Sequence, residues 1–299
     1  MMREFTYSEY KKVIEDHLLD YLPEVDNKSH TIYEAMKYSL TAGGKRIRPI
    51  LLLAACEFAG GNYETALPYA CAIEYIHTYS MIHDDLPCMD NDDLRRGVPT
   101  NHKVYGEAIA TLAGDSLLTA AFETTNRDKL MFFDDFDELK KRISASYEIV
   151  HGAGCYGIIA GQVADIEAEN KECSGEMLDY IHLTKTASLI IAATRAGARL
   201  GGADKVLLED LTIFSENLGL AFQVADDILD VTGTEEQLGK KPGSDDISHK
   251  ATYPSIYGIE TSYRRLEQLT EKAKDALSKY YDNAEFFNYI ADRLSRRAS

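Results

Sequence analysis

Basic residues are scarce in this chain of 299 residues, which has 32 Lys and Arg against 49 Asp and Glu. The resulting formal net charge of −17 argues against nucleic acid and anionic membrane surfaces as partners, because a negative field repels polyanions. Any anionic ligand must therefore be met by local basic groups or by a metal ion.

The chain also lacks the cysteine spacing of a disulfide framework or a zinc site. It has five cysteines, an odd number, and none stands in a C-x-x-C pattern, as is typical of proteins in a reducing cytosol. Its longest apolar run, from Ile50 to Cys56, is too short to span a bilayer. The first ten residues lack the apolar region of a signal peptide. We expect a cytoplasmic protein with no stable membrane insertion.

Convincing period-two alternation and Gly/Ser-rich linkers are both missing, whereas apolar residues recur with helical spacing almost throughout. The first apolar stripe begins at Phe5 and stops at Pro23, Ser29 is predicted to cap a second helix, and Pro49 suits the first turn of a third. Further helices are predicted over residues 63–86, 104–125, 134–151, 154–170, 175–201, 204–232, 252–258, 261–281 and 284–296. The sequence thus predicts one large all-α domain over residues 1–299.

Two aspartate-rich segments lie at or near the ends of predicted helices. The first contains Asp84, Asp85 and Asp90, and the second contains Asp226 and Asp230 with Asp227 between them. Asp226 and Asp230 are one helical turn apart, so they share a face and can bind one cation together. Aspartates within apolar sequence are costly to bury unless they are paired or bound to metal. Mg²⁺ uses few protein carboxylates and completes its shell with water and substrate phosphates, so the pattern predicts a Mg²⁺-clamped diphosphate site.

Basic motifs accompany these acids. The run Gly43-Gly44-Lys45-Arg46-Ile47-Arg48-Pro49 places cations on a turn before a helix, where backbone N–H groups also favour an anion. Most single lysines and arginines are solvated surface groups, and an isolated histidine is more often a packed core residue than a ligand. The remaining candidates for the site are Arg95, Arg96, Lys185, Thr186, Lys240, Lys250, His77, Gln162 and Asp165.

Two predicted loops, residues 88–102 and 233–250, each leave a helix just after its carboxylates. This placement suits lids over a site, although ordinary surface connections would look the same.

From Gly-Gly-Lys-Arg-x-Arg-Pro to Lys-x-Thr-Tyr-Pro, over residues 30–258, the set of motifs resembles the trans-polyprenyl diphosphate synthases. Four residues separate the aspartate pair of the first motif from its third aspartate, as in bacterial and plant members. Among these, the chain is most similar to the bacterial farnesyl diphosphate synthases. The resemblance implies the isoprenoid synthase fold, a single all-helical domain around a central cavity. It also implies a homodimer and three Mg²⁺ per active site.

The resemblance further implies head-to-tail condensation of isopentenyl diphosphate with an allylic diphosphate, dimethylallyl or geranyl. Thr186 and Gln223 would place oxygen dipoles near the developing cation. By helical geometry Asp227 points about a third of a turn away from Asp226, so we expect it behind the metal ligands. The implied Mg²⁺ ligands are Asp84, Asp85, Asp90, Asp226 and Asp230. The implied contacts to the allylic diphosphate are Arg95, Lys185 and Lys240, with Lys250 also at the substrate. The implied contacts to isopentenyl diphosphate are Lys45, Arg48, His77 and Arg96.

Product length is expected to depend on residues one to two turns before the first acidic motif. Ser80 precedes Asp84 by one turn, and Tyr79 precedes it by five residues, or about 7.5 Å along a helix. An aromatic residue at the fifth position resembles synthases that stop at fifteen carbons, although Tyr79 would also suit plain core packing. A farnesyl diphosphate synthase is therefore the prediction, and a geranylgeranyl diphosphate synthase is the nearest alternative.

Three other classes fit less well. A class I terpene cyclase also uses an Asp-rich helix and Mg²⁺, but it needs no second diphosphate site. An HD-type phosphohydrolase is suggested by His83-Asp84, yet the other histidines are not spaced as its ligands. A silent partner subunit would be expected to lose acidic residues, and both clusters are intact here.

Overall fold

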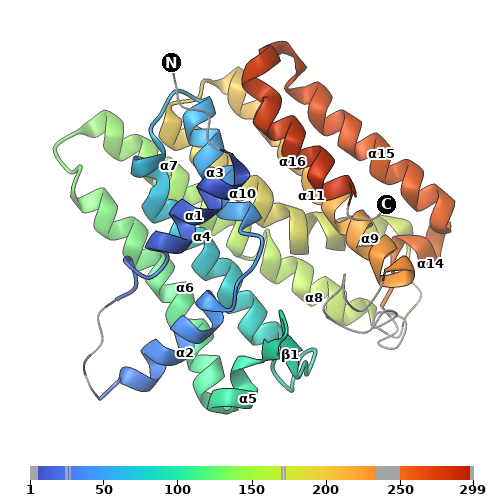
Figure 1. Cartoon of the computed structure of the whole chain (residues 1–299), viewed down its shortest axis with the longest axis horizontal. Coiled ribbons are helices and arrows are strands. Elements are labelled where there is room, and N and C mark those ends of the chain that lie inside the picture. The colour runs from blue at the N-terminus through green and yellow to red at the C-terminus, as the bar shows by residue number, and fades with distance from the viewer. Residues whose placement is uncertain are drawn as a thin grey trace.

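The computed structural model describes residues 6–23, 26, 28–169, 171, 173–233 and 250–296. In that part of the chain nearly all regular structure is helical, which confirms the predicted all-α class (Figure 1). The exception is a two-stranded antiparallel hairpin, β1 (Leu94–Arg95) with β2 (Val98–Pro99). The helical elements are α1 (Tyr7–His17), α2 (His30–Thr41), α3 (Ile47–Phe58), α4 (Tyr63–Asp84), α5 (Asn101–Tyr105), α6 (Glu107–Leu130), α7 (Phe136–Ala153), α8 (Ile158–Ala168), α9 (Gly175–Ile181), η1 (His182–Ala187), α10 (Ser188–Gly201), α11 (Lys205–Thr232), α14 (Tyr253–Tyr257), α15 (Ile259–Ala276), η2 (Ser278–Ala284) and α16 (Glu285–Ser295).

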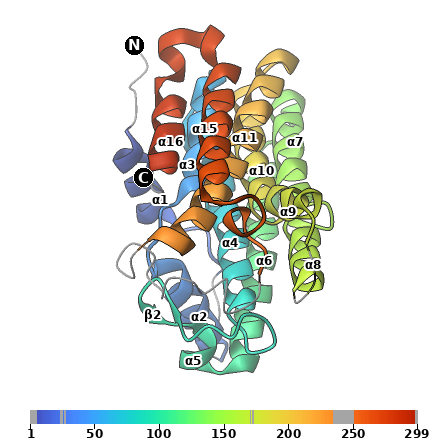
Figure 2. The same ribbon diagram turned by 90° about the vertical axis from the view of Figure 1, so that its right-hand side faces the viewer.

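The centre of the bundle is formed by α3, α4 and α10. Both α3 and α4 are buried on nearly every side, with Leu51, Leu52, Tyr69 and Tyr75 fully enclosed. A helix that is apolar all round is stable only inside a protein, so these two helices become the core against which the others pack. Around them, α6, α7, α11 and α15 run along the length of the molecule (Figure 2). No helix in the described ranges is both long enough and apolar enough to cross a membrane.

Several helices begin where the sequence offers a capping side chain. Thr6 forms a capping box with Glu9 at the start of α1, and Asn62 accepts a hydrogen bond from the backbone of Glu64 at the start of α4. Ser29 stands at the predicted N-cap of α2, but its side chain makes no capping hydrogen bond there.

Three predicted elements differ in detail. The helix predicted over 104–125 is two helices, because Gly106 takes a positive φ of 82° and breaks α5 from α6. The loop predicted over 88–102 contains the β1–β2 hairpin and the first turn of α5. The helix predicted over 175–201 is interrupted by η1, a π-helical stretch from His182 to Ala187. Such π segments often occur at functional sites.

Candidate active site

The first acidic cluster lies at the C-terminal end of the central helix α4. The helix ends at Asp84, Asp85 is its C-cap, and Pro87 follows in the turn, so the helix stops two residues before the predicted boundary. The chain then folds back, because the backbone N–H of Asp90 donates to the carbonyl of Asp84 at 2.9 Å. The negative end of the helix dipole therefore coincides with the aspartates, and the local field favours a cation.

The carboxylates of this cluster are partly desolvated. Burial raises the pKa of Asp84 to about 6; the Lys185 ammonium opposes the shift and the neighbouring Asp90 adds to it. Burial also raises the pKa of Asp85, although the Arg95 guanidinium acts against it. A divalent cation or a bound ammonium group would relieve this cost of crowding carboxylates.

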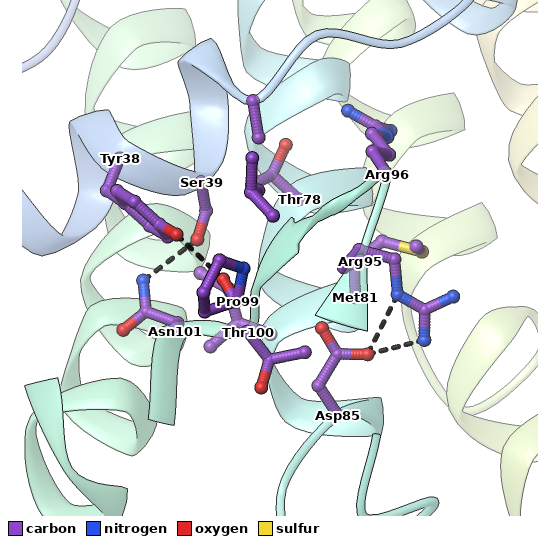
Figure 3. Close-up of a pocket in the computed structure, with 13 residues that line it drawn as sticks. Tyr38, Ser39, Thr78, Met81, Asp85, Arg95, Arg96, Pro99, Thr100 and Asn101 are labelled. Atoms are coloured by element: carbon purple, nitrogen blue, oxygen red, sulfur yellow. Dashed lines mark hydrogen bonds and ion pairs between the residues drawn. The ribbon is translucent and has the colours of Figure 1, made fainter. Parts of the chain in front are cut away.

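The β1–β2 hairpin sends its two arginines to different partners. Its turn residues Arg96 and Gly97 both have positive φ, as a two-residue type I′ hairpin turn requires. Arg95 Nε donates to Asp85 Oδ1 at 2.9 Å (Figure 3). Arg95 Nη2 also donates to Asp92 at 2.8 Å. The hairpin is thus tied directly to the first acidic cluster.

Arg96 reaches the glycine turn before α3. Its guanidinium donates to the carbonyl of Gly43, and a Cβ at Gly44 would lie 2.6 Å from Arg96 Nη1. Gly44 also has a φ of 135°, a backbone conformation that favours glycine at this turn. Nearby, Arg48 Nη1 lies 3.5 Å from Nε2 of His77. The structure thus gathers Arg48, His77 and Arg96, which sequence analysis had assigned to one anion.

Burial and mutual repulsion lower the pKa values of these groups. Burial lowers the pKa of Arg48 to about 10, and the positive charge of Arg96 contributes. Burial and the Arg48 charge hold the pKa of His77 well below its usual value, so this imidazole is neutral at physiological pH. A cluster of cations with a neutral hydrogen-bonding imidazole suits a polyanionic ligand.

Arg46 does not belong to that cluster. It has a left-handed φ of 53° and turns inward, where Nη1 lies 2.5 Å from Oε1 of the buried Glu74 and Nη2 donates to the carbonyl of Leu40. The buried ion pair anchors the turn to α4 and α2. Lys45, one residue earlier, keeps an exposed side chain, and its carbonyl accepts a hydrogen bond from the Tyr7 hydroxyl.

The second acidic cluster lies on α11, opposite η1. Asp226 is partly exposed, whereas Asp227 and Asp230 are buried. Across the gap between the helices, Thr186 Oγ1 donates to Gln223 Oε1 at 2.8 Å. On its other side η1 touches α8 closely, because a Cβ at Gly161 would lie 2.1 Å from the backbone nitrogen of Lys185.

Two lysines bind carboxylates near the first acidic cluster, and both lie close to Asp165 on α8. Lys185 Nζ lies 2.6 Å from Asp165 Oδ2, and Lys250 Nζ lies 3.0 Å from Asp90 and 3.8 Å from Asp165. The two carboxylates raise the pKa of Lys250, although burial alone would lower it. Asp165 was a weaker candidate in the sequence, where only its Gly-Gln-Val-Ala-Asp context marked it.

The five predicted metal ligands carry the oxygen donors that Mg²⁺ prefers. Within the described ranges, no three His, Cys, Asp or Glu side chains converge on a single metal position. Arg95 and Lys250 instead neutralise Asp85 and Asp90. The carboxylate oxygens suit Mg²⁺, and Asp85 and Asp90 would be able to bind it once Arg95 and Lys250 move to other partners. Lys240 lies outside the described residues.

The predicted length-determining residues lie on the buried part of α4. Tyr79 is 7% exposed, and its ring meets the His83 ring edge-on with centroids 5.7 Å apart. His83 in turn lies with Nε2 3.0 Å from the carbonyl of Thr111 on α6. The hydroxyl of Ser80 is hydrogen-bonded to the carbonyl of His77. Tyr79 is therefore part of the packing between α4 and α6.

One hollow lies against the first acidic cluster, and another lies elsewhere on the molecule. A cavity of about 30 Å³ behind Asp85 and Arg95 is lined by Thr78, Thr100 and Asn101 among others (Figure 3). A groove of about 1060 Å³ between α1 and α16 contains none of the clustered aspartates. The C-terminal Arg293, which the sequence did not place, lies in this groove with its guanidinium carbon 4.5 Å from the Tyr7 ring centroid.

Comparison with known proteins agrees with this architecture. Residues 29–289 match the Polyprenyl synthetase family. The chain is 50% identical to a chloroplastic geranylgeranyl pyrophosphate synthase of Capsicum annuum, over 84% of this chain and 67% of that one. It is 46% identical to farnesyl diphosphate synthase of Bacillus subtilis, over 96% of this chain and 95% of that one. An FPP/GFPP synthase structure from Zymomonas mobilis superposes with a TM-score of 0.84 at 32% identity, covering 97% of each chain. The chain belongs to the polyprenyl synthetase family and is a trans-prenyltransferase.

Proposed function

We propose that this enzyme condenses isopentenyl diphosphate with dimethylallyl or geranyl diphosphate and releases farnesyl diphosphate. The observation that carries the length assignment is the buried Tyr79, five residues before Asp84 and held edge-on to His83. An aromatic ring there would limit the depth of an apolar pocket that begins at the aspartates. Farnesyl diphosphate synthases from Bacillus subtilis and Geobacillus stearothermophilus are among the relatives.

Geranylgeranyl diphosphate is the second candidate product. Similarly close relatives from Capsicum annuum and Cyanophora paradoxa carry that activity in their names. The two candidates share every step of the chemistry and differ only in how many times the chain is extended.

Mg²⁺ is the cofactor that we assign, with three ions expected. When bound, it would neutralise the charge that develops on the leaving diphosphate. Its proposed ligands are the carboxylates on the two clusters, Asp84, Asp85, Asp90, Asp226 and Asp230. These carboxylates sit at the end of α4 and on α11, and Lys250 pairs with Asp90 of the first cluster.

The cations now paired with aspartates have a second role in this proposal. When the allylic diphosphate binds, three cations would leave their aspartate partners and contact it. The pairs that would separate are Arg95 with Asp85, Lys185 with Asp165 and Lys250 with Asp90. Lys240 would contact the same diphosphate. Such an exchange keeps each cation and each carboxylate compensated. Arginine suits this role because its planar fork grips two oxygens of a diphosphate.

Isopentenyl diphosphate is assigned to the other basic cluster, formed by Lys45, Arg48, His77 and Arg96. The neutral imidazole of His77 adds a hydrogen bond without adding to the repulsion between Arg48 and Arg96. This second anion site distinguishes a prenyltransferase from a terpene cyclase, which binds only one diphosphate.

The residues beside the reacting carbons then govern the fate of the cation. Breaking the allylic carbon–oxygen bond leaves a carbocation and diphosphate, and the double bond of isopentenyl diphosphate supplies the electron pair of the new carbon–carbon bond. The second cation loses a proton, which passes to the departed diphosphate. Oxygen atoms of Thr186 and Gln223 would stabilise the positive charge, and a closed site must exclude water from it.

Product analysis tests the length assignment. The enzyme is incubated with Mg²⁺, geranyl diphosphate and excess isopentenyl diphosphate, and the dephosphorylated products are separated by chromatography. We expect fifteen-carbon alcohol as the main product. A main product of twenty carbons would replace the assignment with geranylgeranyl diphosphate synthase, and a cyclic hydrocarbon would overturn the proposed reaction.

Replacing Arg48 by Ala separates the two diphosphate sites. Loss of a charged hydrogen-bonded contact costs roughly 1.5–3 kcal/mol, so KM for isopentenyl diphosphate should rise about ten- to a hundred-fold. KM for the allylic substrate should change much less. The control is Arg127→Ala, which removes an exposed arginine paired with Glu123 on α6. An equal rise for both substrates would contradict the assignment of Arg48.

We also propose a homodimer formed through α7 and α8, which lie along the same edge of the molecule (Figure 2). Each helix exposes an apolar stripe at helical spacing. The stripes are Ile143, Tyr147 and Val150 on α7, and Ile159, Val163 and Ile166 on α8. Monomers rarely expose such surfaces. Sedimentation of the wild type and of Ile143→Glu tests this: a wild-type monomer would exclude the dimer.

We propose the cytosol as the compartment, because the number and spacing of the cysteines are typical of a reducing environment. Cell fractionation would test this assignment.

A further inference from the structure

Four side chains from η1 and α11 form a chain of polar contacts, which the backbone of η1 between His182 and Thr186 closes into a ring beside the proposed cation site. Thr186 Oγ1 donates to Gln223 Oε1 at 2.8 Å, and Gln223 Nε2 donates to Asp227 Oδ1 at 3.0 Å. The other carboxylate oxygen, Asp227 Oδ2, lies 3.3 Å from His182 Nε2. His182 and Thr186 are four residues apart on η1, as are Gln223 and Asp227 on α11. The ring therefore connects the two helices at two points.

Asp227 differs from its neighbours in the second cluster. It is 3% exposed, and its Oδ2 also accepts the backbone N–H of Tyr253 at 2.8 Å. Two N–H donors, Gln223 Nε2 and the backbone of Tyr253, therefore bind its two oxygens, and His182 Nε2 lies 3.3 Å from Oδ2. A carboxylate that is buried and so fully engaged is compensated by hydrogen bonds and has little capacity left for a metal ion.

The charge of Asp227 determines the direction of every hydrogen bond in the ring. An ionised carboxylate only accepts, so the Gln223 amide must turn its NH₂ toward Asp227 and its oxygen toward Thr186. Thr186 must then donate its proton to that oxygen. With its proton committed, the Thr186 hydroxyl offers only electron pairs to other neighbours.

Asp227 also connects the ring to the segment that carries Lys250. The hydrogen bond from the Tyr253 backbone holds the start of α14 against α11, three residues after the lysine that reaches Asp90. One buried carboxylate thus touches three segments that carry proposed substrate contacts: η1, α11 and residues 250–257.

We propose that Asp227 is a positioning residue that orients Gln223 and Thr186, and that it is not a metal ligand. Its fixed charge directs the hydroxyl proton of Thr186 away from the site and leaves its electron pairs for the allylic cation. The inference rests on the proposed cation-forming reaction, but it is independent of product length.

Changing Asp227 to Asn should reverse the direction of the hydrogen bonds that join Asp227, Gln223 and Thr186. The new amide can donate to Gln223 Oε1, so that the Gln223 NH₂ donates to Thr186 and the hydroxyl proton turns toward the site. A hydroxyl dipole of the wrong sign should oppose the cation. We expect kcat to fall about ten- to a hundred-fold, the range for one charged hydrogen bond, with KM for both substrates nearly unchanged.

Binding of Mg²⁺ in the presence of inorganic diphosphate separates positioning from metal ligation without measuring turnover. By titration calorimetry, Asp227→Asn should bind within about twofold of wild type, since the proposed ligands remain. The matched control Asp226→Asn removes a proposed ligand charge and should weaken binding at least tenfold, on the scale of a lost charged contact. Equal weakening by both variants would overturn the proposal and make Asp227 a ligand.

Moving the accepting carboxylate from position 227 to position 223 should restore the hydrogen-bond directions and part of the lost kcat. In the double variant Asp227→Asn with Gln223→Glu, the new carboxylate accepts from both the new amide and Thr186. We expect kcat to recover about tenfold relative to Asp227→Asn alone, as a coupled pair should. No recovery in a double variant whose circular dichroism and Mg²⁺ binding match wild type would overturn the proposal. A wild-type product of unexpected length would change only the proposed function.

Discussion

The Asp226→Ala variant is expected to lose kcat on the order of 10³-fold while keeping its helical fold. Asp226 is partly exposed on α11, and it belongs to the acidic cluster opposite η1. Charge on the leaving diphosphate develops mainly in the transition state, so removing a ligand of the neutralising ion should lower kcat more than it weakens substrate binding. Steady-state kinetics at saturating Mg²⁺ and far-ultraviolet circular dichroism measure the two effects.

The matched control for this prediction is Glu216→Ala, which removes an exposed carboxylate from the same helix. It should leave kcat within about twofold, as surface substitutions generally do. Asp85→Ala should resemble Asp226→Ala, because both residues are assigned to one metal clamp. If either aspartate variant retained nearly wild-type kcat at saturating Mg²⁺, the shared clamp would be wrong.

The Tyr79→Ala variant is expected to release products longer than fifteen carbons. Removing the ring opens apolar space toward Ile76 and Tyr75, the fully buried residues on the preceding turn of α4. Such a cavity stays dry and accepts hydrocarbon. The free energy of unfolding should fall by about 3–5 kcal/mol, as for other large aromatic truncations in a core. Chromatography of dephosphorylated products and denaturant unfolding provide the two measurements.

Tyr79→Phe is the control, because it retains the ring that would block the pocket and loses only the hydroxyl. Its products should match those of the wild type. An unchanged product length in a folded Tyr79→Ala enzyme would assign Tyr79 to core packing alone, the alternative that its sequence position left open.

Local sequence determined much of the fold and supplied the candidates for the site. Helical spacing of apolar residues predicted nearly every helix, since a helix buries one face whatever packs against it. Spacing within a helix also determined that Asp226 and Asp230 share a face and that Tyr79 lies one to two turns from Asp84. Aspartates in apolar sequence signalled a site because an isolated buried charge is unstable.

The partner of each charged group was decided only by tertiary structure. Arg46 pairs with Glu74, 28 residues away, and Lys250 with Asp90, 160 residues away. Arg46 faces Glu74, whereas Arg48 faces His77. Nothing in the local sequence distinguishes the two arginines, because both follow the same glycine turn. The difference arises where α4 passes the turn and offers one buried carboxylate.

The π-helical stretch and the β1–β2 hairpin are likewise products of packing. The sequence from His182 to Ala187 has ordinary helical character, and its wider turn depends on contacts with α8 and α11 that no short-range pattern contains. Arg95 and Arg96 are adjacent in sequence, yet one meets Asp85 and the other Gly43. Sequence determined which residues could bind ions and anions, because that depends on side-chain chemistry. Tertiary structure decided which of them meet, because that depends on how distant helices bury their apolar faces together.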